Sequence, residues 1–233
     1  MPTTTEHRFE KALAELPLHS RTPLAWARAV LREPVALLID HAFLERKAAN
    51  NAMEMLTRWP NECSQELRKL WIDTMTAVAR DETAHLVQVT RLLAKRGGEL
   101  DRIHKNAYAG ELRKLVRKGS AGEVVDRLFV AALIEARSCE RFGVLAEAAF
   151  EDDRDPELGA FFQALFSSEL GHYKVFLKLA DGLATPDGPA MTRPAAIRER
   201  WQEMLGDEAE ILARQAPGPR IHSGVSKRLR RNY

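Results

Sequence analysis

Cysteine is nearly absent from this sequence, with only Cys63 and Cys139 among 233 residues. Two thiols are too few for a disulfide framework or for an iron–sulfur cluster held by cysteines, so we expect a reducing compartment. The glycine-rich motif G-x-G-x-x-G, which binds dinucleotide cofactors, is also missing. A redox reaction catalysed by this chain would therefore need electrons from a separate reductase.

Long hydrophobic runs are missing as well. Stretches such as residues 128–134 are far too short to cross a bilayer, and the first ten residues lack the apolar centre of a signal peptide. We therefore expect a cytoplasmic protein with no membrane partner. No segment shows the alternating pattern of a β-strand, which predicts an all-α fold.

Basic residues are unevenly distributed, although the formal net charge is only +2. They concentrate in residues 102–118 and 220–233, and the remainder of the chain is acidic. Such patches suit a polyanion such as RNA, although a solvated helix face and a terminal tail would explain the charges equally well. The candidate phosphate-binding residues are Lys105, Arg113, Lys114, Arg117, Lys118, Lys227, Arg228, Arg230 and Arg231.

Apolar residues recur at helical spacing in four long segments. These are residues 35–58, 61–97, 120–145 and 155–182. Shorter helices are expected at about residues 108–117 and 195–215. We interpret residues 1–233 as one domain, with a core bundle at about 35–183, a C-terminal helix at about 195–215 and a basic tail at 216–233.

Local patterns predict where several helices begin. They are Thr22 before Pro23, Asn61, Ser120 with Glu123, and Asp155 before Pro156. The side chains of Thr, Asn, Ser and Asp can accept hydrogen bonds from the N–H groups of a first helical turn, and proline is tolerated at the first position.

A glutamate and a histidine three residues apart occur twice, and a further glutamate precedes each pair on an earlier helix. The six residues are Glu45, Glu82, His85, Glu135, Glu169 and His172. The two halves align at offsets of 90 residues (135 − 45) and 87 residues (172 − 85). Each glutamate falls on an apolar helical stripe, where an unpaired acid would cost several kcal/mol. We therefore predict that the repeat is a binding site rather than a surface pattern of ion pairs.

Four carboxylates and two imidazoles in this arrangement are the ligand set of ferritin-like di-metal bundles. Oxygen-rich ligation with one nitrogen per metal suits iron best and manganese second. Glu135 is a better ligand than Glu140, because five residues rotate a helix by about 140°. His41 lies one turn before Glu45 and could orient it, although a core role is favoured. Tyr173 is expected to pack in the core.

Longer segments carry a resemblance to a known family. They are LERKAANNAMEML (44–56), ARDETAHLVQVTRLLAKRG (79–97), IEARSCERF (134–142), SSELGHYKVFLKLA (167–180) and RIHSGV (220–225). Together they resemble the MiaE family of tRNA hydroxylases over about residues 20–225. The resemblance implies a ferritin-like fold and an O₂-dependent monooxygenase that hydroxylates the isopentenyl group of 2-methylthio-N6-isopentenyladenosine in tRNA. It also implies that the six residues hold two iron ions.

Such a substrate needs an apolar cleft that opens onto a basic rim. Three other functions stay open: a ferritin-like oxidase or oxygenase of a small molecule, an iron-storage protein, and a metal-free helical bundle that binds RNA.

Overall fold

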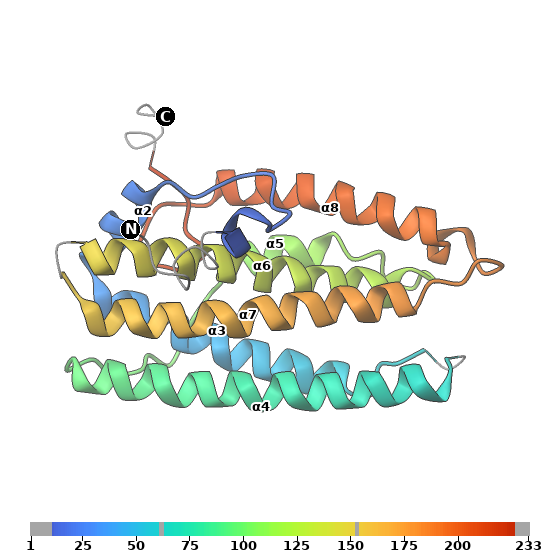
Figure 1. The fold of residues 1–233 in the computed structure, drawn as a ribbon, viewed down its shortest axis with the longest axis horizontal. Coiled ribbons are helices and arrows are strands. Elements are labelled where there is room, and N and C mark those ends of the chain that lie inside the picture. The colour runs from blue at the N-terminus through green and yellow to red at the C-terminus, as the bar shows by residue number, and fades with distance from the viewer. Residues whose placement is uncertain (1–10, 61–62, 152–153, 227–233) are drawn as a thin grey trace.

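The computed structural model describes residues 11–60, 63–151 and 154–226 (Figure 1). Within these ranges the regular elements are helices and no strand occurs, so the all-α prediction is confirmed. The elements are α2 (Leu24–Val30), α3 (Pro34–Met55), α4 (Gln65–Lys95), α5 (Ala107–Lys114), α6 (Glu123–Phe150), α7 (Pro156–Gly182), the short 3-10 helix η2 (Ala190–Thr192) and α8 (Pro194–Arg214). None of these helices is both long and apolar enough to cross a membrane.

The four long helices form a ferritin-like bundle of two helix pairs. Helix α3 packs along α4, and α6 packs along α7, while α4 and α7 join the two pairs (Figure 1). Each pair contains one copy of the repeated sequence pattern, with the single glutamate on the first helix and the Glu-x-x-His pair on the second. The duplication therefore produces a bundle whose two halves face each other.

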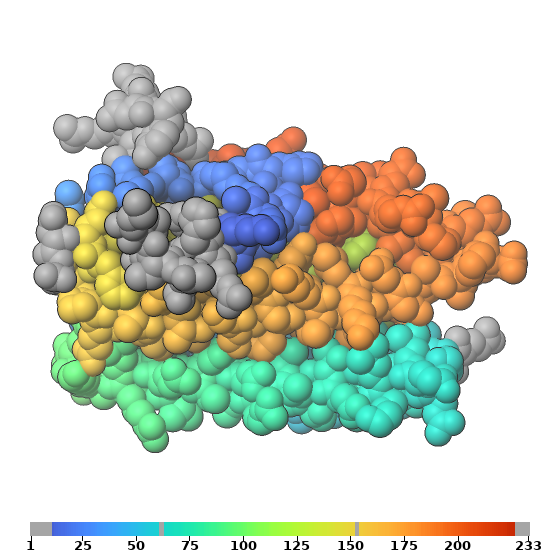
Figure 2. All heavy atoms as spheres, in the orientation of Figure 1, coloured from blue at the N-terminus to red at the C-terminus, as the bar shows by residue number. Residues whose placement is uncertain are grey.

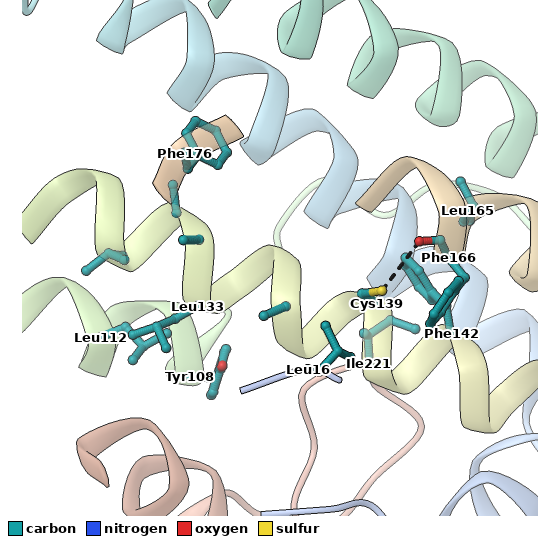
Figure 3. Close-up of a cluster of buried hydrophobic side chains, with 14 of the residues drawn as sticks. Leu16, Tyr108, Leu112, Leu133, Cys139, Phe142, Leu165, Phe166, Phe176 and Ile221 are labelled. Carbon is teal, nitrogen blue, oxygen red and sulfur yellow. Dashed lines mark hydrogen bonds between the residues drawn. The ribbon is translucent and has the colours of Figure 1, made fainter. Parts of the chain in front are cut away.

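Helix α6 lies at the centre of the molecule and is buried over most of its length. Helices α2, α5 and α8 pack against it in addition to α7. Figure 2 shows the N-terminal segment and α8 lying along the side of α7 that faces away from α4. The apolar core includes Leu133, Phe142 and Phe176, and the thiol of Cys139 donates to the carbonyl of Phe166 at 3.4 Å (Figure 3). A helix enclosed in this way can bury polar side chains on several faces.

The predicted start of α7 is confirmed. The Asp155 carboxylate accepts a hydrogen bond from the N–H of Leu158 at 3.1 Å, and Pro156 is the first helical residue. The predicted start of α6 at Ser120 is wrong, because the helix begins at Glu123. The Glu123 carboxylate accepts instead from the N–H of Gly119 at 2.5 Å. Gly119 has a φ of 73°, a left-handed conformation that glycine adopts without strain, and this allows a tight turn before α6.

The prediction that Thr22 caps α2 is also wrong. Helix α2 begins at Leu24, and Thr22 makes no capping hydrogen bond. Its backbone N–H and its hydroxyl each donate to the Glu140 carboxylate at 2.6 Å. The prediction for Asn61 lies outside the described residues, and α4 is capped by Ser64, whose hydroxyl accepts from the N–H of Leu67 at 3.1 Å.

Candidate metal centre

The structure brings the six residues of the repeated pattern together inside the bundle. They are Glu45 on α3, Glu82 and His85 on α4, Glu135 on α6, and Glu169 and His172 on α7. All six are buried, with no more than 7% of any residue exposed. A carboxylate side chain is rarely buried to this extent without a partner.

The candidate ligand atoms form two overlapping groups, and within each group they lie within 4.8 Å of one another. The first group is Glu45, Glu82, His85 and Glu169, and the second is Glu82, Glu135, Glu169 and His172. Glu82 and Glu169 belong to both. This arrangement suits two neighbouring cations that share two carboxylates.

In each group, the histidine Nδ1 atom lies close to several carboxylate oxygens. Nδ1 of His85 is 3.6 Å from a carboxylate oxygen of Glu45, 3.6 Å from one of Glu82 and 3.5 Å from one of Glu169. Nδ1 of His172 is 2.8 Å from Glu82 and 3.6 Å from Glu169. The two rings are 6.1 Å apart between centroids. A cation placed among these atoms would therefore meet both oxygen and nitrogen donors.

Within the described part of the chain, several candidate ligand atoms of the cluster have no well-formed hydrogen bond. They are Oε1 of Glu82, Nδ1 of His85, Oε2 of Glu169 and Nδ1 of His172. Among the described residues, no lysine or arginine forms an ion pair with any of the four carboxylates. Because buried polar groups are almost always satisfied, these atoms fit a site that is completed by metal ions.

The electrostatics of the cluster indicate an excess of negative charge. Burial raises the pKa of Glu135 and Glu169 well above its ordinary value, and neighbouring carboxylates raise it further. Burial alone would lower the pKa of His85 and His172, but the attraction of the nearby glutamate carboxylates overrides this effect and raises both values to about 9. Without metals, protons must therefore compensate the carboxylates. Divalent cations would take over this role.

Two further residues orient members of the cluster. His41 lies between Glu45 and a group of phenylalanine rings, and its Nε2 hydrogen-bonds the Glu45 carboxylate. His41 is therefore buried in the core, as favoured, and also contacts a candidate ligand. Nε2 of His172 lies 3.5 Å from Asp81, a contact that sequence reasoning missed. A carboxylate on the second nitrogen of a ligand histidine commonly fixes its orientation.

Glu140 lies outside the cluster, as its helical phase predicts, and so does Tyr173, for which packing was expected. Glu140 forms an ion pair with Arg137 at 3.0 Å. The ring of Tyr173 packs against Trp201 with centroids 6.4 Å apart. Neither residue is among the candidate ligand groups.

A groove between α3, α5 and α6 reaches the cluster at Glu135. Its inner part, about 50 Å³, is lined mostly by small and apolar residues, together with Lys47, Asn51, Asn106 and Arg113. Its outer part, about 300 Å³, shares Asn51 and Arg113 with the inner part and adds Lys118. A larger cavity, about 510 Å³, lies elsewhere, between the N-terminal segment and α8, and none of the six residues lines it.

The predicted phosphate-binding residues have different surroundings. Arg113 and Lys118 are exposed along the groove, and Lys105 is exposed beside a separate cavity. Lys114 is exposed and forms an ion pair with Glu111. The guanidinium of Arg117 binds the buried Asp126, with two contacts of 2.8 Å. The remaining candidates, Lys227, Arg228, Arg230 and Arg231, lie outside the described residues.

The fold and the cluster together define a ferritin-like helical protein whose site fits a di-metal centre. A family model described as tRNA-(ms2io6A)-hydroxylase (MiaE) matches residues 12–223. This chain therefore belongs to the MiaE family, and the resemblance seen in the sequence is confirmed.

Curated relatives and a solved structure agree with this family. The chain is 36% identical to a tRNA 2-(methylsulfanyl)-N(6)-isopentenyladenosine(37) hydroxylase of Pseudomonas putida, over 89% of this chain and 92% of the relative. It is 28% identical to the protein of the same name from Salmonella typhimurium, over 89% of this chain and 88% of the relative. A solved structure, "Protein 43 with aldehyde deformylating oxygenase activity from Synechococcus", superposes with a TM-score of 0.74 at 31% identity, covering 89% of this chain and 96% of that one.

Proposed function

We propose that this protein is a tRNA-modifying monooxygenase that hydroxylates the isopentenyl group of 2-methylthio-N6-isopentenyladenosine, using O₂ at a non-haem di-iron centre. The observation that carries the proposal is the buried cluster of six residues, reached by a groove, in a member of the MiaE family. The proposed ligands are Glu45, Glu82, His85, Glu135, Glu169 and His172.

The donor set supports iron. Four carboxylates balance the charge of two divalent ions, and each ion would gain one imidazole nitrogen. Manganese is the second choice for the same donors. When bound, the iron ions would supply the activation of O₂ for insertion into a C–H bond.

The residues of the chain position the substrate and protect the site. The apolar inner groove, with Leu44, Ala131 and Ile134, suits a prenyl chain directed towards Glu135. Arg113 and Lys118 on the outer groove suit the phosphates of the nucleotide. Phe142, Phe161 and Phe162 pack around His41 and make that side of the cluster apolar.

The electrons would come from a separate protein. The sequence has neither a dinucleotide-binding motif nor the cysteines of an iron–sulfur cluster. We therefore propose an external reductase as a second partner. Cytoplasmic tRNA and a cytoplasmic reductase would place the protein in the cytoplasm.

A second candidate function is an oxygenase that acts on an aldehyde. The structural neighbour whose title describes aldehyde deformylating oxygenase activity favours it. The basic residues along the groove have no evident role with such a substrate. The tRNA hydroxylase is therefore the stronger proposal.

The test compares both substrates on the iron-loaded protein. The protein is supplied with O₂ and a reductant, and either tRNA that carries the prenylated nucleotide or a long-chain aldehyde is added. Mass spectrometry of the digested tRNA should show the addition of one oxygen atom to the prenylated nucleoside. Conversion of the aldehyde without any change in the tRNA would support the second candidate instead, and an iron content below about one ion per chain would count against both.

A further inference from the structure

A lysine lies within the inner groove, close to the metal cluster. Lys47 is two residues after Glu45 on α3 and lines the same part of the groove as Glu135. Most of its neighbours there are apolar or small, including Leu44, Ala48 and Ala131. A charged side chain in such surroundings needs either a partner in the protein or a partner in the ligand.

A chain of hydrogen bonds fixes the position of the Lys47 ammonium group. Its nitrogen is 2.7 Å from Nδ1 of His104, and Nε2 of His104 is 2.7 Å from the Asp40 carboxylate. An ammonium group can only donate, so Nδ1 accepts and Nε2 carries the hydrogen that is donated to Asp40. The other Asp40 oxygen accepts the N–H of Ile221 at 2.9 Å. The buried end of the chain is therefore anchored to the backbone.

The same contacts leave donor capacity on Lys47. An ammonium group carries three N–H bonds, and among the described residues its only acceptors are Nδ1 and, at 3.4 Å, the carbonyl oxygen of His104. The His104 ring stacks on Phe43 at 4.9 Å, which limits its movement. The protein thus holds a cation at a fixed place in the groove without neutralising it by a direct ion pair.

We propose that Lys47 binds a phosphate of the substrate nucleotide and that Asp40 and His104 are positioning residues that act through it. The proposal rests on the proposed function, since it takes tRNA as the substrate. Arg113 and Lys118 continue the positive charge from Lys47 towards the surface. A phosphate at Lys47 would fix how far the attached nucleotide can enter, and so where its prenyl chain lies relative to Glu135. Lys47 is therefore a specificity-determining residue as well as a source of affinity.

The test measures tRNA binding and turnover separately. Iron-loaded wild type, Lys47→Met and Lys47→Arg are titrated with tRNA carrying the prenylated nucleotide at several salt concentrations. Lys47→Met should weaken binding roughly 10-fold and reduce the slope of log K against log salt by about 0.7 to 1. Turnover at saturating tRNA should also fall several-fold, because the same contact places the prenyl chain relative to Glu135. Lys47→Arg should keep the wild-type slope, because it keeps the charge.

Two controls separate the possible outcomes. Lys95→Met removes an exposed lysine at the C-terminal end of α4, where it forms an ion pair with Glu157. This variant should leave the affinity for tRNA and its salt dependence unchanged. Asp40→Asn should weaken binding by a smaller factor than Lys47→Met. If Lys47→Met folds, holds iron and binds tRNA with the wild-type slope, Lys47 only ties α3 to His104 and the proposal is wrong. If Lys47→Met does not fold, Lys47→Gln takes its place with the same criteria.

Failure of the proposed function gives a different result. In that case wild type itself would neither bind nor modify tRNA. The phosphate role of Lys47 would then be rejected together with the tRNA substrate.

Discussion

Helix α6 carries two buried clusters of charged residues, and they are compensated in opposite ways. Glu135 belongs to the metal cluster, in which four carboxylates have no arginine or lysine partner among the described residues. The second cluster, which we call the arginine cluster, contains Arg137, Arg141, Glu140 and Glu208. Arg137 binds Glu208 at 2.8 Å and Glu140 at 3.0 Å, so two positive and two negative charges cancel.

The difference separates a binding site from a structural element. Arg141 contacts Glu140 at 3.7 Å and lies over the ring of Trp26 at 3.8 Å, so its charge has a partner inside the protein, although its guanidinium nitrogens have no hydrogen-bond partner among the described residues. The hydroxyl of Tyr108 also donates to Glu208 at 2.9 Å. The arginine cluster therefore joins α6 to the N-terminal segment, α5 and α8, and its formal charges balance within the protein. The metal cluster, by contrast, is incomplete until cations bind.

The largest effect is expected from comparing Glu135→Gln with Glu140→Gln. Loss of a metal ligand should lower hydroxylation of tRNA at least about 100-fold. Substitutions of residues that only hydrogen-bond to a metal ligand already lower activity or metal affinity by about 10- to 100-fold. It should also lower the iron content of the purified protein. Glu140→Gln should keep iron and keep activity within a few-fold. Metal analysis and turnover at saturating tRNA check both variants.

The opposite result would reverse the assignment. If Glu140→Gln loses iron while Glu135→Gln keeps it, the arginine cluster would be the binding site. The metal cluster would then need another explanation for its unsatisfied donor atoms.

The free energy of unfolding should depend more on the arginine cluster than on the metal cluster. Arg137→Met leaves Glu140 and Glu208 without their main cation, and breaking a buried ion pair in this way costs about 3–5 kcal/mol. In metal-free protein, burial and the neighbouring Glu45 raise the pKa of Glu82, so Glu82→Gln replaces a side chain that already favours its neutral form and should change stability by no more than about 1 kcal/mol. Urea unfolding of both metal-free variants measures the difference. A loss of several kcal/mol in Glu82→Gln would show that the carboxylates are already compensated within the protein.

The sequence predicted the regular parts of this architecture because they depend on periodicity. Helical spacing was enough to place the long helices and to direct Glu45 and Glu135 inward. Two of the predicted helix starts failed, one because a distant partner takes the capping residue and the other because a local turn does. Thr22 binds Glu140 on α6 instead of capping α2, and Ser120 lies in a turn closed by Gly119.

Contacts between distant segments were also beyond the sequence. Lys47 and His104 are 57 residues apart, and nothing in the local pattern of either residue indicates that they meet. Arg117 belongs to a basic segment, yet its guanidinium binds the buried Asp126. A charge pattern shows how many cations a segment has, but only tertiary structure shows which of them already have a partner.

The smallest effect is expected from the pH dependence of the arginine cluster. Burial alone would raise the pKa of Glu140. Arg137, Arg141 and Thr22 together lower this pKa by more than burial raises it, so its value lies below the ordinary 4.5. A lowered pKa in the folded state means that the stabilisation from Glu140 is present above pH 4.5 and is lost as the pH falls through the folded value. The glutamine side chain of the Glu140→Gln variant does not titrate. The difference in unfolding free energy between wild type and Glu140→Gln should therefore be constant from about pH 6 to 8 and narrow below about pH 4.5.

Urea unfolding of the two metal-free proteins at matched pH values measures this difference, and other titrating groups cancel between them. The change should be smaller than the 3–5 kcal/mol expected for Arg137→Met, because protonation removes one charge but leaves the side chain in place. A difference that stays constant down to the lowest pH at which both proteins fold would show that Glu140 gains nothing from its ionised form. The charges of the arginine cluster would then not be its stabilising element, and the contrast with the metal cluster would rest on packing alone.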